Sequence, residues 1–139
     1  MIYQAVNMEM LCESLIELLF RNQRTASHKI DTREYFKEIC RYLENNLEKD
    51  LTLQAITEAF HVSQSHLSYI FRKYAEQSFQ TYLTSLRIEK AKTMLSAGSH
   101  VLIKDVAQMV GYHDQFYFSK VFKLYTGLSP TEYLRKEET

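Results

Sequence analysis

The chain has 139 residues, 45% apolar and 24% charged, which places it among soluble globular proteins with enough length for one domain or two very small ones. Its three glycines and one proline are too few turn formers for a many-stranded sheet, so helices with short connections are favoured. The formal net charge of zero argues against a nucleic-acid partner, but residues 51–136 hold ten Lys/Arg against six Asp/Glu, so a polyanion would bind this part.

Residues 1–30 are predicted to form a helix and a linker. Residues 1 to about 24 place apolar side chains at three- and four-residue steps, which predicts an amphipathic helix, and the polar residues 22–29 follow it. The apolar stripe of this helix has no obvious surface to cover. We interpret residues 1–30 as the tail of a missing domain, and the alternative is a helix that forms a homodimer.

The main domain, residues 31–139, begins with a second helix. Asp31 can cap its start, and Glu34 stands three residues later, where it could complete a capping box. One side of this helix carries the apolar residues Phe36, Ile39, Cys40, Leu43 and Leu47.

Beyond residue 50 the chain repeats one pattern. Residues 53–60 and 103–110 both predict a short amphipathic helix, followed by a turn and by a second helix capped at Ser63 or Asp114. The two copies lie 50 residues apart before the turn and 51 apart after it. Helix, short turn and helix make the helix-turn-helix unit, whose second helix can lie in a DNA major groove.

The two predicted units, about 52–74 and about 103–125, are joined by one predicted helix of about 78–95. A helix of that length extends about 27 Å. With the widths of the units added, the two second helices would lie roughly 34 Å apart, which is one turn of B-DNA. The expected fold is therefore all-α, with two tandem helix-turn-helix subdomains joined by a long linker helix and preceded by an N-terminal helix.

The second helix of each unit has an apolar side and a polar side. The apolar sides are predicted to face the core, with Leu67, Ile70, Phe71 and Tyr74 in the first copy and Phe118, Val121, Phe122 and Tyr125 in the second. The polar side of the second copy suits a DNA groove, because Lys can bond guanine, Gln adenine, and an aromatic edge the thymine methyl. The first copy offers short hydroxyls and one tyrosine, which predicts weaker base readout and some dependence on DNA shape.

Phosphate contacts are expected at helix N-termini, where backbone N–H groups point toward anions, and at basic side chains near helix ends. The candidates are Thr52, Ser63, Arg72, Lys73, Lys104 and Lys123. For each of them a merely solvated side chain is the alternative.

Gly127 stands where a left-handed residue would end the second reading helix. Ser129, Pro130 and Glu132 then match the N-cap, N1 and N3 positions of a further helix. These residues are interpreted as boundaries of a packed helix, and the candidate site lies on the opposite side of that helix.

The repeated region resembles the DNA-binding domain of the AraC/XylS family of bacterial transcription regulators. The residues that carry the resemblance in the second copy are Ala107, Val110, Gly111, Tyr112, Asp114, Tyr117, Phe118, Ser119, Phe122, Lys123, Gly127, Ser129, Pro130 and Tyr133. Those in the first half include Leu53, Ile56, Phe60, Val62, Ser63, His66, Leu67, Ile70, Phe71, Ser78, Phe79, Leu83, Arg87, Ile88, Ala91 and Leu95. The resemblance covers about residues 36–135 and implies seven helices. It also implies base contacts by Ser65, Ser68, Tyr69, Gln115, Phe116 and Lys120.

Three positions depart from the family's pattern. Thr57 stands where the family usually has alanine, Glu76 where it has glycine, and Leu134 where arginine often follows the tyrosine. A left-handed Glu76 would cost on the order of 1 kcal/mol unless the turn is remodelled, because its Cβ is crowded there. We therefore expect the first unit to be the looser one.

Arg87 on the linker helix could reach a phosphate, but it stands beside the apolar Ile88 and Ala91. We favour a structural role for Arg87, in an internal ion pair with Asp105.

The expected function is sequence-specific binding of double-stranded DNA by a cytoplasmic transcription regulator, with RNA polymerase as a further partner. The alternative is a protein-interaction module that contacts RNA polymerase or another domain without binding DNA. An enzyme is not expected, since no nucleophile stands with a neighbouring base and no carboxylates pair in a plausible cleft. Cys12 and Cys40 are isolated and the histidines are scattered, so neither a metal nor a cofactor is expected. No apolar run approaches the roughly 18 residues of a membrane helix.

Overall fold

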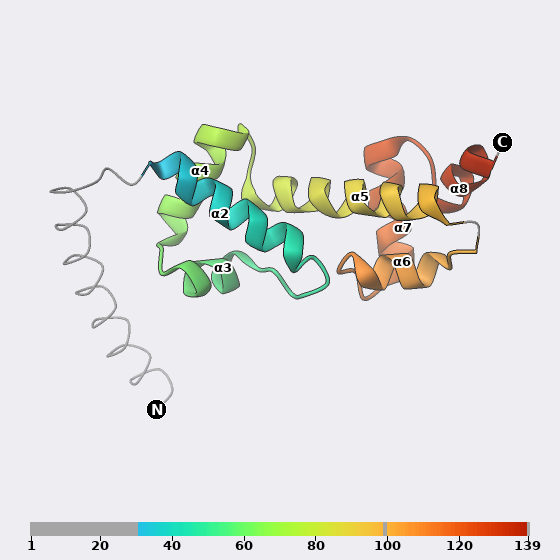
Figure 1. Cartoon of the computed structure of the whole chain (residues 1–139), viewed down its shortest axis with the longest axis horizontal. Coiled ribbons are helices and arrows are strands. Elements are labelled where there is room, and N and C mark those ends of the chain that lie inside the picture. The colour runs from blue at the N-terminus through green and yellow to red at the C-terminus, as the bar shows by residue number, and fades with distance from the viewer. Residues whose placement is uncertain (1–30, 99, 139) are drawn as a thin grey trace, which may run out of the picture.

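The structure, a computed structural model, describes residues 31–98 and 100–138 (Figure 1). These residues form seven α-helices and no strand: α2 (Thr32–Asn45), α3 (Leu53–Phe60), α4 (Gln64–Ala75), α5 (Phe79–Ala97), α6 (Ile103–Met109), α7 (Gln115–Thr126) and α8 (Pro130–Glu138). The all-α prediction is confirmed. The predicted N-terminal helix and linker, residues 1–30, lie outside the described residues.

Helix α5 lies in the centre and carries a group of three helices at each end (Figure 1). The first unit consists of α2, α3 and α4, and the second of α6, α7 and α8. The N-terminal half of α5 contributes Phe79 and Leu83 to the core of the first unit, whereas the C-terminal half contributes Ile88, Ala91 and Leu95 to the core of the second. Two helix-turn-helix subdomains joined by one long helix are therefore present.

Aromatic rings pack edge to face in both cores, as aromatic pairs prefer. The rings of Phe71 and Phe79 have centroids 5.4 Å apart at 83° in the first core, and those of Phe122 and Tyr133 have centroids 5.4 Å apart at 82° in the second. Phe71, Phe118 and Phe122 are fully buried. The apolar sides predicted for α4 and α7 are thus used to attach these helices to the molecule.

Side-chain caps set the starts of the helices. Four predicted caps accept hydrogen bonds from first-turn amides: Asp31, Ser63, Asp114 and Ser129. Glu132 completes a capping box by accepting a hydrogen bond from the Ser129 amide at 3.2 Å. The capping box suggested for α2 is not formed, because the Glu34 carboxylate accepts a hydrogen bond from Lys37 Nζ at 3.1 Å instead.

The helices α4 and α7 both end on a left-handed residue. Gly127 ends α7 with φ of 84°, and Glu76, which is 51 residues earlier, ends α4 with φ of 57°. The turn after α4 is therefore not remodelled around Glu76. Because an L residue is crowded in this conformation, the first unit carries backbone strain that the second unit avoids.

Tyr125 was predicted to face the core, and this prediction was wrong, since its side chain is 42% exposed. Its counterpart Tyr74 is partly buried because α2 places the ring of Phe36 5.5 Å from it. In the second unit α8 packs Tyr133 against Phe122, closer to the middle of α7, and leaves the end of α7 uncovered. The two copies match in sequence, but different neighbouring helices cover them.

Arg87 has the structural role that we favoured, with different partners. Its Nη2 donates a hydrogen bond to the carbonyl oxygen of Lys49 at 2.9 Å, and its guanidinium lies over the Tyr112 ring, 5.6 Å from the centroid. The suggested pairing with Asp105 was wrong, because Asp105 is exposed in the first turn of α6.

None of the described helices is long and apolar enough to cross a membrane.

Candidate nucleic-acid interface

The outward side of α7 carries an exposed aromatic ring among lysines. Phe116 is 73% exposed, and Lys120 and Lys123 are exposed further along the same side, while Phe118 is completely buried on the other side. The start of the helix is fixed by Asp114 Oδ1, which accepts a hydrogen bond from the Phe116 amide at 2.9 Å. An exposed phenylalanine held in this way is unusual on a solvated helix face and suits contact with a base edge.

Three other polar or aromatic residues of α7 differ in how far their side chains are available for contact with DNA. Gln115 is partly buried, and its carbonyl oxygen accepts a hydrogen bond from the Ser119 hydroxyl at 2.8 Å. The Ser119 hydroxyl is thus used within the helix. Tyr117 is 59% exposed and lies beside Tyr112 with a centroid distance of 6.0 Å.

The outward side of α4 is built from hydroxyls. Ser65 is exposed, Ser68 is partly buried and Tyr69 is 54% exposed. The opposite side of α4, with Leu67 and Ile70, is fully buried. The division into an inward and an outward side therefore holds in both copies.

Tyr69 is the centre of a small cluster that periodicity alone did not reveal. The His66 ring stacks on Tyr69 with a centroid distance of 6.4 Å, and Lys73 Nζ lies 5.7 Å from the Tyr69 centroid. The pKa of Lys73 is raised, first by Tyr69 and then by Tyr74, whose ring centroid lies 5.3 Å from Nζ. Residues 66, 69 and 73 follow i, i+3, i+7 spacing, which is the signal that could have grouped them.

The residues predicted for phosphate contact are all exposed: Thr52, Ser63, Arg72, Lys73, Lys104 and Lys123. Thr52 Oγ1 accepts a hydrogen bond from the Ala55 amide at 3.0 Å, and Ser63 Oγ accepts one from the His66 amide at 3.1 Å. Each hydroxyl still has its own proton to donate. The two caps are thus compatible with a phosphate at the start of α3 and of α4.

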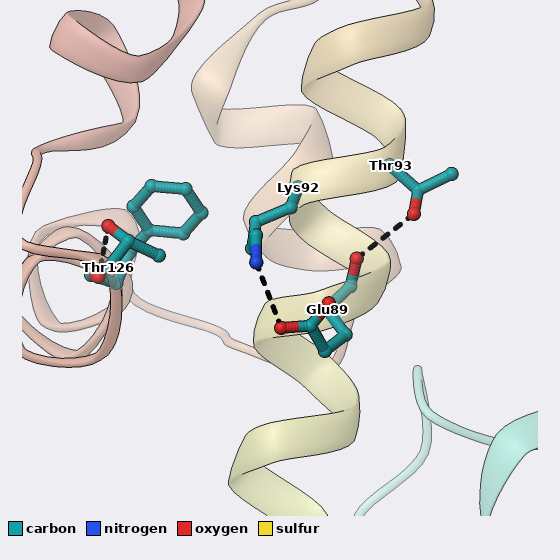
Figure 2. A network of polar contacts seen from close by, with 5 residues as sticks. Glu89, Lys92, Thr93 and Thr126 are labelled. Atoms are coloured by element: carbon teal, nitrogen blue, oxygen red, sulfur yellow. Dashed lines mark hydrogen bonds and ion pairs between the residues drawn. The ribbon is translucent and has the colours of Figure 1, made fainter.

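Four of the basic candidates have no acidic partner in the part of the chain that the structure describes. Within the described residues, none of Arg72, Lys104, Lys120 and Lys123 forms an ion pair. In contrast, Lys92 on α5 bends back onto Glu89 of the same helix, at an Nζ to Oε1 distance of 3.0 Å (Figure 2). The hydrogen bond with Glu89 raises the pKa of Lys92. Arg72, Lys120 and Lys123 on the reading helices, and Lys104 on α6, therefore have no ion pair with another described residue to break before they bind a polyanion.

The two reading helices are placed in a similar way at the two ends of α5. In Figure 1, α4 begins beside α3 and α7 begins beside α6, and both helices run from the lower to the upper part of the molecule. The two sets of predicted base contacts therefore stay apart, one set toward each end of α5. Among the residues that the structure describes, no group of three or more His, Cys, Asp or Glu side chains could hold a metal ion.

The fold and these two outward surfaces define the class of the protein as a double helix-turn-helix DNA-binding domain. A family profile described as "Helix-turn-helix domain" matches residues 56–136. Among solved structures, the C-terminal domain of AraT, a response regulator from Geobacillus stearothermophilus, is 35% identical with a TM-score of 0.69, over 72% of this chain and 83% of that one.

Two curated relatives are operon regulators. The raffinose operon transcriptional regulatory protein RafR of Pediococcus pentosaceus is 38% identical over 105 residues, which are 76% of this chain and 38% of the relative. The arabinose operon regulatory protein of Escherichia coli (strain K12) is 33% identical over 131 residues, covering 90% of this chain and 44% of the relative. The chain thus spans about two fifths of the length of these relatives. The chain belongs to the AraC/XylS family of transcription regulators and corresponds to the C-terminal DNA-binding domain of these proteins.

Proposed function

We propose that the domain recognises a specific sequence of double-stranded DNA by inserting α4 and α7 into successive major grooves. One observation carries this proposal: both helices bury apolar side chains on one side, such as Phe71 of α4 and Phe118 of α7, and expose the opposite side, at the two ends of a single helix. The 19 residues of α5 extend about 28 Å. With the width of the units added, this length suits two grooves one helical turn, or about 34 Å, apart.

The second reader, α7, carries the stronger base contacts in this proposal. Lys120 bonds guanine, Gln115 bonds adenine after a modest rearrangement of its partly buried side chain, and Phe116 touches a thymine methyl. Of the three, Lys120 is the group most able to discriminate, since it is exposed and forms no ion pair with another described residue.

The first reader, α4, contributes weaker contacts. Ser65, Ser68 and Tyr69 offer hydroxyls, which can donate to or accept from several base edges and therefore discriminate less. The Tyr69 ring is held between His66 and Lys73, so its position on the helix surface is defined before DNA binds. We expect part of the specificity at this half-site to come from DNA shape.

Phosphate contacts position the domain on the duplex. They come from the capped starts of α3 and α4, at Thr52 and Ser63, and from the exposed cations Arg72, Lys73, Lys104 and Lys123. Such contacts carry affinity and salt dependence, and they carry no direct sequence information.

Two single substitutions separate reading from positioning. A duplex selected from random sequence and an unselected duplex are compared by fluorescence anisotropy over a series of salt concentrations. Lys120→Ala is expected to lose about 1–3 kcal/mol on the selected duplex at one base pair and little on the unselected one. Lys123→Ala is expected to weaken both duplexes alike and to reduce the salt slope by about one. Equal losses of Lys120→Ala on both duplexes would remove Lys120 as a base reader.

A protein partner is a second role of the same domain that the exposed surface supports. Leu124 is 82% exposed, Leu102 65% and Met109 56%, so several large apolar side chains are exposed besides the predicted base contacts. RNA polymerase or another domain of a regulator is the partner that we propose for them, in the cytoplasm where bacterial DNA is transcribed. A Met109→Asp variant on α6 that keeps DNA binding and loses transcriptional activation would support this role, and unchanged activation would argue against it.

Homodimer formation through residues 1–30 remains a separate proposal, because these residues lie outside the described part of the chain. Sedimentation of the chain with and without residues 1–28 tests it. A monomer in both cases would reject the dimer.

A further inference from the structure

The two helix-turn-helix units touch each other directly, in addition to sharing α5. In Figure 1, the loop after α2 extends to the turn between α6 and α7. There, His113 Nε2 lies 2.9 Å from Asp50 Oδ1, across 63 residues of sequence. Beside this pair, the hydrogen bond from Arg87 to the Lys49 carbonyl attaches α5 to the same loop. We call the set Lys49, Asp50, Arg87, Gly111, Tyr112 and His113 the inter-unit contact.

Gly111 shows how close this approach is. A Cβ on Gly111 would lie 2.1 Å from the carbonyl oxygen of Leu47 and 2.8 Å from Nε and Cζ of Arg87. The φ of Gly111 is 101°, beyond the region that L residues reach readily. In the first unit the corresponding residue is His61, which carries a side chain at φ of 54° in the equivalent turn. The turn of the first unit thus accepts a side chain at this position. In the second unit, the Leu47 carbonyl of the first unit occupies the space that a Cβ on Gly111 would need.

Arg87 is the residue that joins all parts of the contact. It is placed on α5 between Leu83, which belongs to the first core, and Ile88, which belongs to the second. Its guanidinium reaches the loop of the first unit at Lys49 and the ring of the second unit at Tyr112. Burial lowers the pKa of Arg87, while Tyr112 and Asp50 act in the opposite direction. Arginine stays charged in such an environment.

The Nε of Arg87 is buried and has no hydrogen-bond partner among the described protein groups. An apolar side chain would avoid leaving a polar atom unpaired. A residue that only filled this space would not need a guanidinium, whereas a residue that ties two surfaces together needs its fork of donors. The His113 and Asp50 side chains are 80% and 79% exposed, so their pair adds little by itself.

We propose that the inter-unit contact fixes the position of α7 relative to α4, with Arg87 as its positioning residue, and so determines which half-site spacing the domain accepts. This inference rests on the proposed function, in which α4 and α7 read separate segments of one duplex. With α5 alone, the two units are attached through one helix. The inter-unit contact adds a second attachment and prevents each unit from turning about α5.

The test measures spacing preference. One base pair inserted between the half-sites turns the second by about 34° and moves it by about 3.4 Å. The wild-type domain is expected to lose about tenfold or more in affinity for duplexes lengthened or shortened by one base pair, because one reader leaves its base contacts. Arg87→Met keeps an unbranched apolar stem and removes the donors, and its discrimination between spacings is expected to fall below about threefold. Lys90→Met, an exposed position on the same helix, removes the same charge and is expected to discriminate as the wild type does.

A second measurement needs no DNA. Spin labels at Ala59→Cys on α3 and Gln108→Cys on α6, both exposed, report the distance between the units in a chain whose native cysteines are replaced by serine. A narrow distance distribution with Arg87 and a broad one with Arg87→Met are expected. If Arg87→Met does not fold, Arg87→Lys takes its place, since lysine keeps the charge and most of the stem but lacks the planar fork of donors, and a broader distribution than that of the wild type is still expected.

The outcomes separate the two proposals. A wild-type domain that binds selected and unselected duplexes equally contradicts the proposed function, while the spin-label result still judges the inter-unit contact. A wild-type domain that reads sequence, together with an Arg87→Met variant that keeps full spacing discrimination and a narrow distance distribution, overturns the inference alone.

Discussion

Replacing Glu76 by glycine is expected to stabilise the domain. Glu76 ends α4 with φ of 57° and ψ of 27°, its side chain is exposed, and it forms no ion pair with another described residue. Relieving a left-handed L residue returns roughly 1–2 kcal/mol, and the added freedom of glycine in the unfolded chain opposes this by about 0.4–1 kcal/mol. The expected net gain is about 0.5–1 kcal/mol, or a rise of roughly 2–6 °C in Tm for a domain of this size. Urea denaturation followed by circular dichroism measures it.

The equivalent position in the second unit gives the opposite result. A Cβ at Gly127 would meet no atom within 4 Å, so Gly127→Ala changes only the backbone preference at φ of 84°. It is expected to destabilise by about the amount that Glu76→Gly gains. Glu76→Ala is the control, because it removes the charge and keeps the Cβ, and it should leave stability nearly unchanged. If Glu76→Gly and Glu76→Ala behave alike, or if Glu76→Gly destabilises, the left-handed strain assigned to the first unit is not there.

Two further changes test other parts of the structure. Gly111→Ala is expected to destabilise the domain more than Gly127→Ala, because its Cβ would meet the Leu47 carbonyl, whose backbone cannot move aside as a flexible side chain can. Thermal unfolding of the two variants compares the losses in Tm, and a smaller loss for Gly111→Ala would contradict the prediction. Burial raises the pKa of Cys40, so in a Cys12→Ser chain Cys40 should be alkylated much more slowly in the native state than in urea at pH 8, and equal rates would contradict its burial. Because the folded-state pKa is the higher one, the stabilisation by this neutral thiol is complete below the unfolded pKa and is lost as the pH rises through the folded one.

The secondary structure and the facing of most side chains could be predicted because they follow from local rules. Helical periodicity identified the buried sides of α4 and α7, and the repeat at 50 and 51 residues gave two independent views of one unit. Caps such as Ser63 and Asp114 are likewise local, since they bind amides two or three residues away. The prediction for Tyr125 failed because its exposure depends on which helix covers the end of α7, and periodicity does not contain that information.

The partners of charged groups were predictable only where they are local. Arg87 was assigned to a structural role because of its apolar neighbours on α5, but its contacts come from residues 49 and 112, which only the tertiary fold brings together. The pairing of His113 with Asp50 has the same origin. For the candidate interface, exposure of Phe116 and Lys120 followed from the helix period, whereas their contacts with bases stay predictions.

Hydroxyl-radical footprinting on a duplex selected from random sequence tests the central claim most directly. If α4 and α7 enter successive major grooves, the cleavage pattern will show two protected backbone regions about 10 base pairs apart on one face of the duplex. A single protected region, or two regions on opposite faces, would contradict the placement of two readers by one rigid linker helix.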